Sequence, residues 1–182
     1  MKNKLTHLVA AFLCVACLAH ASSDEPQTQD SYSYVSFGSG PINGLGTSLL
    51  VPNIAIGYRS KGSSILGSDT GLSFSTIGTA HQFSLQYLMH YYLSPYDASS
   101  PYLGAGLRMS GLFANHGKKA MAMLSADFAV GKELESSFGK GHFVEMHVCS
   151  PSVWVSNVNS QEGKKKGFTA IPTMYLTYGM GF

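Results

Sequence analysis

The last residues of the chain impose the strongest constraint on its fold. Large apolar side chains occupy every second position from 174 to 182, namely Met174, Leu176, Tyr178, Met180 and Phe182. A repeat of two residues is the pattern of a β-strand with one apolar face. Such a face is stable only when it is removed from water, either against a protein core or against lipid.

The same alternation recurs along most of the preceding chain. Seven further runs show it, at residues 32–40, 50–59, 70–78, 83–92, 102–110, 124–130 and 144–149. These lengths are near the roughly 9 to 11 residues that a tilted strand needs to cross a bilayer. We therefore predict an all-β fold, an eight-stranded antiparallel up-and-down transmembrane β-barrel formed by residues 31–182.

The first residues have the features of an export signal. Lys2 and Lys4 precede an apolar run from 8 to 18, which is followed by Ala19-His20-Ala21. The run is shorter than the roughly 20 residues of a spanning helix, so we expect 1–21 to be a signal peptide cleaved near Ala21. A lipoprotein signal with acylation at Cys17 is the alternative. Residues 22–30 are polar and predict a flexible lead into the barrel.

The composition of the remaining chain limits its partners. Charged residues make up 12% of the sequence, about half the roughly 25% of an ordinary soluble domain. Without Lys2 and Lys4, the 12 basic residues fall to 10 against 10 acidic ones, and this balance argues against nucleic acid as a partner. Cys149 becomes the only cysteine, which excludes an internal disulfide.

Two stretches carry a resemblance to a known family. A short turn at 94–101 leads into Tyr102-Leu103-Gly104-Ala105-Gly106-Leu107, and the final strand ends in Phe182. Both stretches resemble the small OmpA/OmpX-type outer-membrane barrels, although Met180 stands where that family usually has Tyr. The resemblance implies a location in the outer membrane, surrounded by its lipid.

The same resemblance implies how the barrel is inserted and oriented. Barrel-insertion machinery would read Met174, Leu176, Tyr178, Met180 and Phe182, and the links after strands two, four and six would be periplasmic turns. The polar stretch 157–167 would then be a loop outside the cell. Loops on that side are where a surface ligand, of unknown nature, would bind.

Six ionisable residues are expected to point away from lipid. They are Arg59, His90, Arg108, Asp127, Glu145 and His147, and all stand opposite the apolar faces of their strands. An eight-stranded barrel has an interior just wide enough for side chains, and a buried charge without a partner costs several kcal/mol. We predict a structural cluster with Arg108 facing Asp127 and Glu145 near His147. A proton-linked or ion-conducting role is the alternative.

The strand at 144–149 also permits a catalytic interpretation. Glu145, His147 and Cys149 lie on one face, and outer-membrane lipid A deacylases carry a similar His-x-Ser pair. Here Cys replaces Ser, and Ser150 lies on the opposite face. Neighbours two apart on a strand are separated by about 7 Å, which predicts no direct hydrogen bond between them. We therefore predict no enzymatic activity, with an acyl hydrolase using His147 as the alternative.

Metal or cofactor sites are not indicated. The histidines at 81, 90, 116, 142 and 147 are scattered singly, and Cys149 has no partner at ligand spacing. Trp154, Tyr91, Tyr92, Tyr96, Tyr102 and Phe143 lie near strand ends, where the aromatic girdle of a membrane barrel is expected, although ordinary strand propensity explains them equally well.

Three functional classes remain. The first is a non-enzymatic integral outer-membrane protein with a structural or surface-interaction role. The second is a lipid-modifying barrel enzyme. The third is a secreted, lipocalin-like barrel, which requires inverted faces with the apolar residues inside and the charged cluster outside.

Overall fold

Ten β-strands make up most of the chain that the computed structural model describes, which comprises residues 30–42, 49–61, 65–94, 99–114, 119–134, 141–150, 152–158, 165–169 and 172–182. The predicted signal peptide, 1–21, and residues 22–29 of the predicted lead lie outside these ranges. The strands are β1 (Asp30–Ile42), β2 (Leu49–Lys61), β3 (Leu66–Ile77), β4 (Ala80–Tyr92), β5 (Pro101–Ala114), β6 (Lys119–Leu134), β7 (His142–Cys149), β8 (Ser152–Val158), β9 (Lys165–Thr169) and β10 (Thr173–Gly181).

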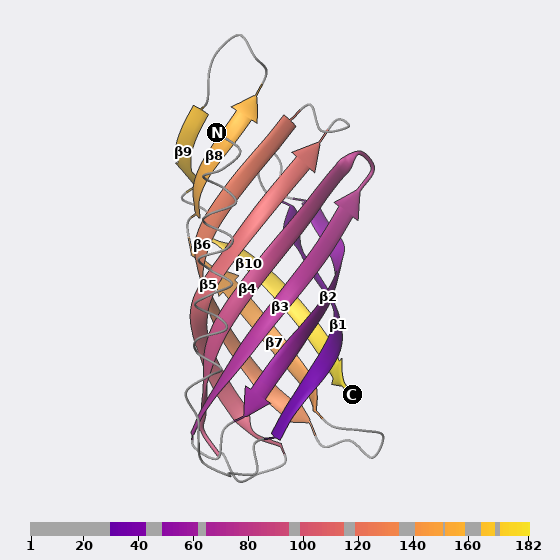
Figure 1. Ribbon diagram of the computed structural model, residues 1–182, viewed down its shortest axis with the longest axis vertical. Coiled ribbons are helices and arrows are strands. Elements are labelled where there is room, and N and C mark those ends of the chain that lie inside the picture. Colours follow the sequence, from indigo (N-terminus) through magenta and orange to yellow (C-terminus); the bar gives the residue numbers. More distant parts are fainter. Residues whose placement is uncertain are drawn as a thin grey trace.

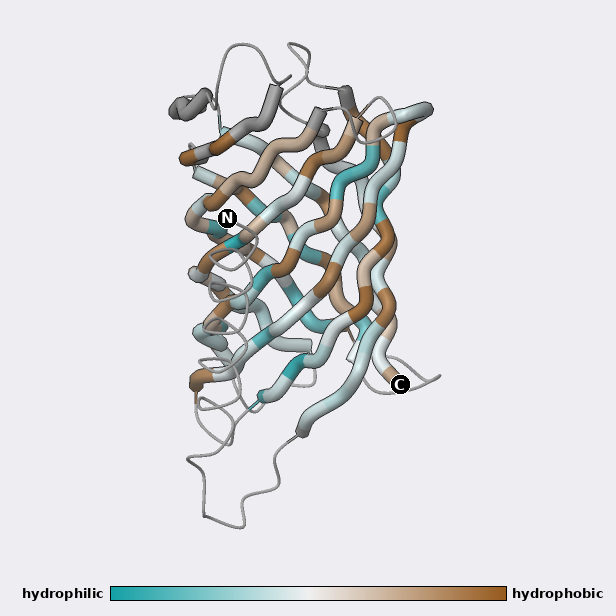
Figure 2. Tube along the Cα trace, turned by 45° about the horizontal axis from the view of Figure 1, so that its top comes forward, coloured by the Kyte–Doolittle hydropathy of each residue, from teal (hydrophilic) through white to brown (hydrophobic). Residues whose placement is uncertain are grey.

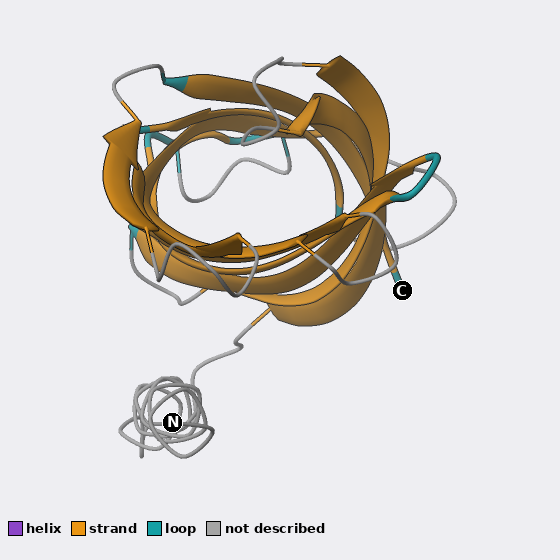
Figure 3. Cartoon of the chain, turned by 90° about the horizontal axis from the view of Figure 1, so that it is seen from above, coloured by secondary structure: helices purple, strands orange, loops and turns teal. Residues whose placement is uncertain are grey.

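The strands form one closed antiparallel wall, seen as a ring from above in Figure 3. Each strand from β1 to β5 pairs with the next one, and β10 returns to pair with β1. The second half of β6 pairs with β7 and its first half with β8, while β7 pairs with β10 and β8 with β9. β8 continues the line of β7 along the wall, and β10 continues that of β9, so the ten strands occupy eight positions. The predicted eight-stranded barrel is therefore confirmed.

The step from β7 to β8 contains a break in register. Pairing with β6 shifts by one residue between the pair Asp127↔Cys149 and the pair Leu124↔Val153. Ser150 compensates locally, because its N–H donates to the Ala126 carbonyl at 2.8 Å and its hydroxyl accepts from the Ala126 N–H at 3.2 Å. An extra residue of this kind is a β-bulge, which bends a strand without ending its pairing.

The bulge corrects one prediction. The stretch 157–167 was expected to be a loop, but Asn157 and Val158 belong to β8, and Lys165, Lys166 and Gly167 belong to β9. The apolar alternation changes phase at the bulge, so the continuation of the strand was missed. Residues 159–164 lie outside the described part of the chain.

The strand directions place the links at two ends. The start of β1 and the end of β10 lie together at the lower end of Figure 1, where β2 leads to β3, β4 to β5 and β6 to β7. This is the arrangement that the sequence predicted for the links after the second, fourth and sixth strands. At the upper end, β3 and β4 are joined by a two-residue turn in which Gly78 has a φ of 54°, a conformation typical of tight hairpins.

Hydrophobic and hydrophilic residues alternate along the strands, as the colours of Figure 2 show, and the two faces of the wall differ in polarity. Outward positions carry most of the large apolar side chains, among them Ile56, Leu107, Phe128 and Leu176, with exposed fractions of 58%, 43%, 53% and 57%. The interior side chains are mostly polar, charged or aromatic. The outward face is therefore apolar and the inward face polar, as the alternation along the sequence predicted.

Glycine allows large rings to lie flat against the inner wall. A Cβ at Gly57 would meet the ring of Tyr34 and would lie 2.6 Å from the backbone oxygen of Thr70. At Gly131, a Cβ would lie 2.5 Å from the Tyr102 ring. Because the interior is narrow, the lack of a side chain at Gly57 and at Gly131 leaves the space that the rings of Tyr34 and Tyr102 occupy.

We expect Gly57→Val to destabilise the barrel by about 3 kcal/mol, since the new side chain meets backbone as well as a ring. Ile56→Val, a change at the neighbouring outward position, serves as the control and should alter stability by less than about 1 kcal/mol. Urea unfolding in lipid vesicles, followed by the fluorescence of the single tryptophan, measures both. Equal free energies of unfolding for the two variants would contradict the close packing.

Candidate functional site

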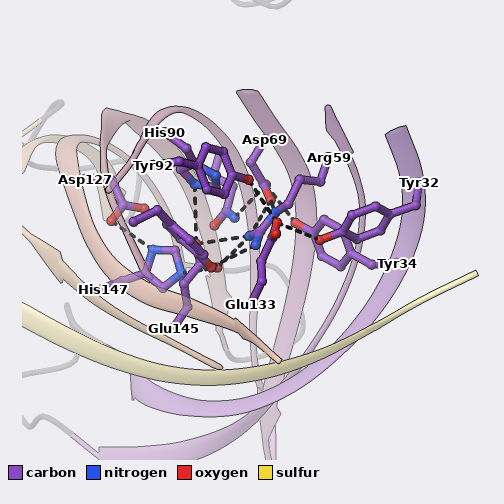
Figure 4. A network of polar contacts seen from close by, with 12 residues as sticks. Tyr32, Tyr34, Arg59, Asp69, His90, Tyr92, Asp127, Glu133, Glu145 and His147 are labelled. Carbon is purple, nitrogen blue, oxygen red and sulfur yellow. Dashed lines mark hydrogen bonds and ion pairs between the residues drawn. The ribbon is translucent and has the colours of Figure 1, made fainter. Parts of the chain in front are cut away.

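All six residues of the predicted interior cluster lie inside the barrel, on β2, β4, β5, β6 and β7, and each is at most 4% exposed. They are Arg59, His90, Arg108, Asp127, Glu145 and His147. Figure 4 shows most of them converging from several strands into one network of polar contacts. We call this set, with the partners described below, the interior network.

The upper part of the interior network is built around Arg108. Its Nε donates to Oδ2 of Asp127 at 2.8 Å, and its Nη2 donates to Oε1 of Gln86 at 2.6 Å. Nδ1 of His147 lies 3.2 Å from Oδ1 of Asp127, and the ring of Tyr175 lies 4.7 Å from the Arg108 guanidinium carbon. Both carboxylate oxygens of Asp127 are therefore engaged.

The middle part is built around Arg59, which is fully buried. Its Nε donates to Oδ2 of Asp69 at 2.8 Å, its Nη1 donates to the Tyr102 hydroxyl at 2.8 Å, and its Nη2 lies 3.1 Å from both oxygens of Glu145. The Phe143 ring centroid is 3.8 Å from the guanidinium carbon. A cation stacked on a ring and bonded to two carboxylates is strongly held.

Two side chains connect the middle and upper parts. Gln86 accepts from Arg108 and lies 3.4 Å from Asp69 through its amide nitrogen. His147 lies between Asp127 and Glu145, with Nε2 3.4 Å from Oε2 of Glu145. The two side chains thus come within ion-pair distance, although the strand spacing predicted no direct hydrogen bond between them. The spacing of about 7 Å describes backbone positions, whereas the long side chains lean toward each other in the crowded interior.

His90 is a partial member of the interior network. Its Nε2 is 3.4 Å from Oε1 of Glu145, an ion-pair distance, but neither ring nitrogen has a partner in hydrogen-bonding geometry within the described residues. Its ring stacks on Tyr102 with a centroid distance of 4.6 Å and an interplanar angle of 27°. Tyr92 lies edge-on to the same ring at a centroid distance of 6.2 Å, so the described contacts of His90 are mainly aromatic.

The lower part closes the interior near the end where the chain finishes. Glu133 accepts from the Tyr92 hydroxyl at 3.0 Å and from Lys61 Nζ at 3.1 Å, and the Tyr32 hydroxyl lies 3.4 Å away. Lys61 also lies 4.7 Å from the centroid of the Tyr92 ring. These side chains fill the lower mouth of the barrel.

Several of these partners were missed in the sequence. Asp69 precedes the predicted third strand, and Lys61 and Glu133 lie at strand ends where the alternation gives no clear inward or outward face. A buried arginine requires a carboxylate partner. Searching the neighbouring strand for a carboxylate to pair with Arg59 would therefore have identified Asp69. In the described interior, Arg59, Lys61 and Arg108 are matched by the carboxylates of Asp69, Asp127, Glu133 and Glu145.

The expected aromatic girdle was partly wrong. Tyr91 faces outward, but Tyr92, Tyr102 and Phe143 are each 1% exposed and lie inside the barrel. Position near a strand end does not decide which face a residue occupies, and these three rings pack against Arg59, Lys61 or His90 instead. Tyr96 and the side chain of Trp154 lie outside the described part.

A small cavity lies beside the upper part of the interior network. Its lining includes Ser36, Asn53, Ser73, Gln86 and Arg108. The cavity offers about 10 Å³ of free space, room for about one water molecule. The cavity is therefore too small for a solute much larger than water.

The described residues offer little for catalysis or metal binding. His147 and Cys149 are each 1% exposed, and the Ser150 hydroxyl is bonded to the backbone N–H of Ala126.

No group of three or more His, Cys, Asp or Glu side chains within the described ranges is arranged to hold a metal ion. No helix in this part of the chain is long and apolar enough to cross a membrane.

A closed eight-stranded wall, apolar outside and charged inside, places the protein among the small antiparallel β-barrels. No protein-family model and no curated protein matches the sequence. The crystal structure of Neisserial surface protein A (NspA) is similar, with a TM-score of 0.50 and 14% sequence identity over 84% of this chain and 97% of that chain. At this identity the likeness shows the fold alone, and for the fold it confirms the resemblance to small outer-membrane barrels.

We expect Arg108→Met to destabilise the barrel by about 3 to 5 kcal/mol, because it leaves the Asp127 carboxylate buried without its main partner. The double change Arg108→Met with Asp127→Leu should recover most of that loss, since replacing a whole buried pair by apolar residues is often neutral. Urea titrations in vesicles measure the free energy of unfolding of each variant. A double variant as unstable as the single one would show that Asp127 is not the partner that matters.

Proposed function

We propose that the protein is an integral outer-membrane barrel without enzymatic activity, which serves the envelope structurally or through surface interactions of its loops. The observation that carries the proposal is the distribution of polarity across the wall. The described outward face is apolar around the whole barrel, while the described ion pairs between Arg or Lys and carboxylates lie inside or at its lower mouth.

The outer face supports lipid rather than water as its surroundings. Large apolar side chains with exposed fractions of 38% to 75% occur on every one of the eight wall positions. Full burial of such a side chain stabilises by about 1.5 to 3 kcal/mol, and the exposed part forgoes its share of that in water. Soluble monomers rarely expose apolar patches larger than a few hundred Å². The lipocalin-like alternative requires the opposite faces, and the described interior does not meet that condition.

The ends of the apolar face carry residues typical of a membrane interface. Near the upper end, Phe74, His81 and Phe83 form an outward cluster, with Phe74 and His81 stacked at 6.3 Å. Near the lower end, His142 Nδ1 lies 2.7 Å from the Tyr178 hydroxyl. From a rise of roughly 3.4 Å per residue and a tilt of about 40°, the outward residues between positions 81 and 91 span about 25 Å, the height of a lipid-facing band.

The absence of enzymatic activity is supported by the state of His147. Both of its ring nitrogens face carboxylates of the interior network, and the ring is buried away from the lipid face. A general base must reach its substrate within about 3 Å, and lipid outside the wall does not come so near.

A charged residue placed on the outer face tests the membrane location. Leu107→Arg, in the middle of β5, should cost about 2 to 4 kcal/mol in a bilayer, while Leu103→Arg, near its lower end, should cost less. In water both should be tolerated, because the two leucines are similarly exposed at 43% and 48%. The measurement is the amount of urea-resistant, heat-modifiable protein in washed outer membranes. Recovery of the wild-type protein in the soluble fraction would overturn the proposal.

We further propose that the outward residues of β10, with Phe182, are what the barrel-insertion machinery recognises. Phe182 is 75% exposed, and its N–H donates to the Ser33 carbonyl at 2.9 Å, a bond that any residue there can make except proline. Phe182→Ala should therefore leave the stability of refolded protein within about 1 kcal/mol but reduce assembly in cells. Phe182→Tyr, which keeps the aromatic ring, is the matched control. Equal assembly of both variants, quantified by the heat-modifiable band, would contradict this role.

A further inference from the structure

The buried charges in the middle and upper parts of the interior network do not balance while its histidines are neutral. Two arginines face three carboxylates there, namely Arg59 and Arg108 against Asp69, Asp127 and Glu145, and each of the five is at most 4% exposed. The lower part has one described cation and one carboxylate, which pair with each other. Because a buried charge without a partner is strongly unfavourable, the described interior calls for one more positive charge.

His147 lies between two of these carboxylates, as Figure 4 shows. Its Nδ1 is 3.2 Å from Oδ1 of Asp127, and its Nε2 is 3.4 Å from Oε2 of Glu145. A neutral imidazole has one N–H and one lone pair, so it donates to only one of the two. The lone pair of the other nitrogen would then face a negatively charged oxygen. A ring protonated on both nitrogens avoids this repulsion.

The guanidinium of Arg108 also approaches the ring, with Nη2 3.4 Å from Nδ1 of His147. That nitrogen carries two N–H groups, and two oxygens lie closer to it, Oε1 of Gln86 at 2.6 Å and Oδ2 of Asp127 at 2.7 Å. The contact with His147 is therefore the longest of three that share two hydrogens. Nδ1 itself lies closer to the Asp127 carboxylate, which places it as a donor to Asp127 rather than as an acceptor from Arg108.

His90 is less suited to carry the missing charge. Its Nε2 is 3.4 Å from Oε1 of Glu145, but neither ring nitrogen has a hydrogen-bond partner within the described residues. In the described network, His90 is at ion-pair distance from one carboxylate, whereas His147 is at that distance from two. The surroundings therefore favour a charged ring at His147 over one at His90.

The other titratable neighbours of His147 do not compete for the proton. Each of the two carboxylates is paired with an arginine, Asp127 with Arg108 and Glu145 with Arg59, which favours the ionised form of both. Imidazole is also the stronger base, by about two pH units in water. Tyr175 lies opposite His147 on β10, and Cys149 lies two residues along β7. Neither a phenol nor a thiol supplies a positive charge.

We infer that His147 is an imidazolium in the folded barrel, a third buried cation that Asp127 and Glu145 hold between them. An imidazolium has no lone pair with which to accept a proton, so His147 acts as a fixed charge and not as the general base of an acyl hydrolase. The inference deepens the proposed non-enzymatic role but rests on the interior alone. Its failure would leave the argument from the outer face, and with it the membrane location, untouched.

Nuclear magnetic resonance of the histidine ring nitrogens tests the inference on the unaltered protein. The protein is labelled with nitrogen-15 histidine and measured in detergent micelles at pH 8, as the species that migrates as folded on unheated gels. At that pH, a histidine with the ordinary pKa of about 6.5 is only about 3% charged. We expect one ring with a proton on each nitrogen. A spectrum in which every ring is neutral would overturn the inference.

Two variants identify the charged ring. His147→Gln should abolish the doubly protonated signal, while His90→Phe, which keeps a ring against Tyr102, should retain it. The reverse pattern would place the charge on His90 and overturn the inference. If His147→Gln does not fold, His90→Phe still decides, because loss of the signal there contradicts the inference and its retention supports it.

Removing a carboxylate tests charge balance as the cause. Glu145→Gln leaves two carboxylates against two arginines and gives an amide that can donate to Nε2 of His147. We expect the charged fraction of the His147 ring at pH 8 to fall about tenfold or more. Glu133→Gln, which removes a carboxylate from the lower part of the interior network, is the matched control and should leave that fraction unchanged. Equal charged fractions in the two variants would overturn the inference.

Discussion

The requirement that every backbone N–H and C=O find a partner governs this structure. Strands exposed to an apolar environment satisfy it only by closing on themselves, and here closure depends on the pairing of β10 with β1. The bulge after Cys149 shows how strictly the rule is kept, because the Ser150 hydroxyl accepts a backbone N–H at the register shift. The places where the ladder stops, beside Pro41 and Pro52, are confined to the upper rim.

Closure with eight strands leaves a narrow interior, and the interior network follows from that narrowness. Charged groups placed there are out of water, so each requires a partner. Arg59 and Arg108 each meet this need with carboxylates from other strands. The contacts run between β2, β3, β5, β6 and β7 and thereby tie opposite walls together. The network is therefore a structural element of the barrel as much as a candidate site.

The two ends of the barrel differ in how their strands are tied together. At the lower end, Glu133 accepts hydrogen bonds from Lys61 and Tyr92, and these side chains fill the mouth. At the upper end, the pairing of β1 with β10 stops at Ser39 and that of β2 with β3 stops at Asn53. Val51 packs there against Leu112 across the interior.

Alternation along the sequence determined the strands, their faces and the closed barrel, because a period of two relates each side chain to one face without knowledge of its neighbours. It also placed the six ionisable residues of the predicted cluster inside. Only the tertiary structure decided which side chains meet. The ion pair of Arg59 on β2 with Glu145 on β7 joins strands that lie apart in the wall, and the approach of His147 to Glu145 depends on side-chain directions that strand spacing does not give. Alternation likewise turns the Tyr102 and Phe143 rings inward, but only the structure shows that both pack on Arg59, because contacts between non-neighbouring strands leave no periodic trace in the sequence.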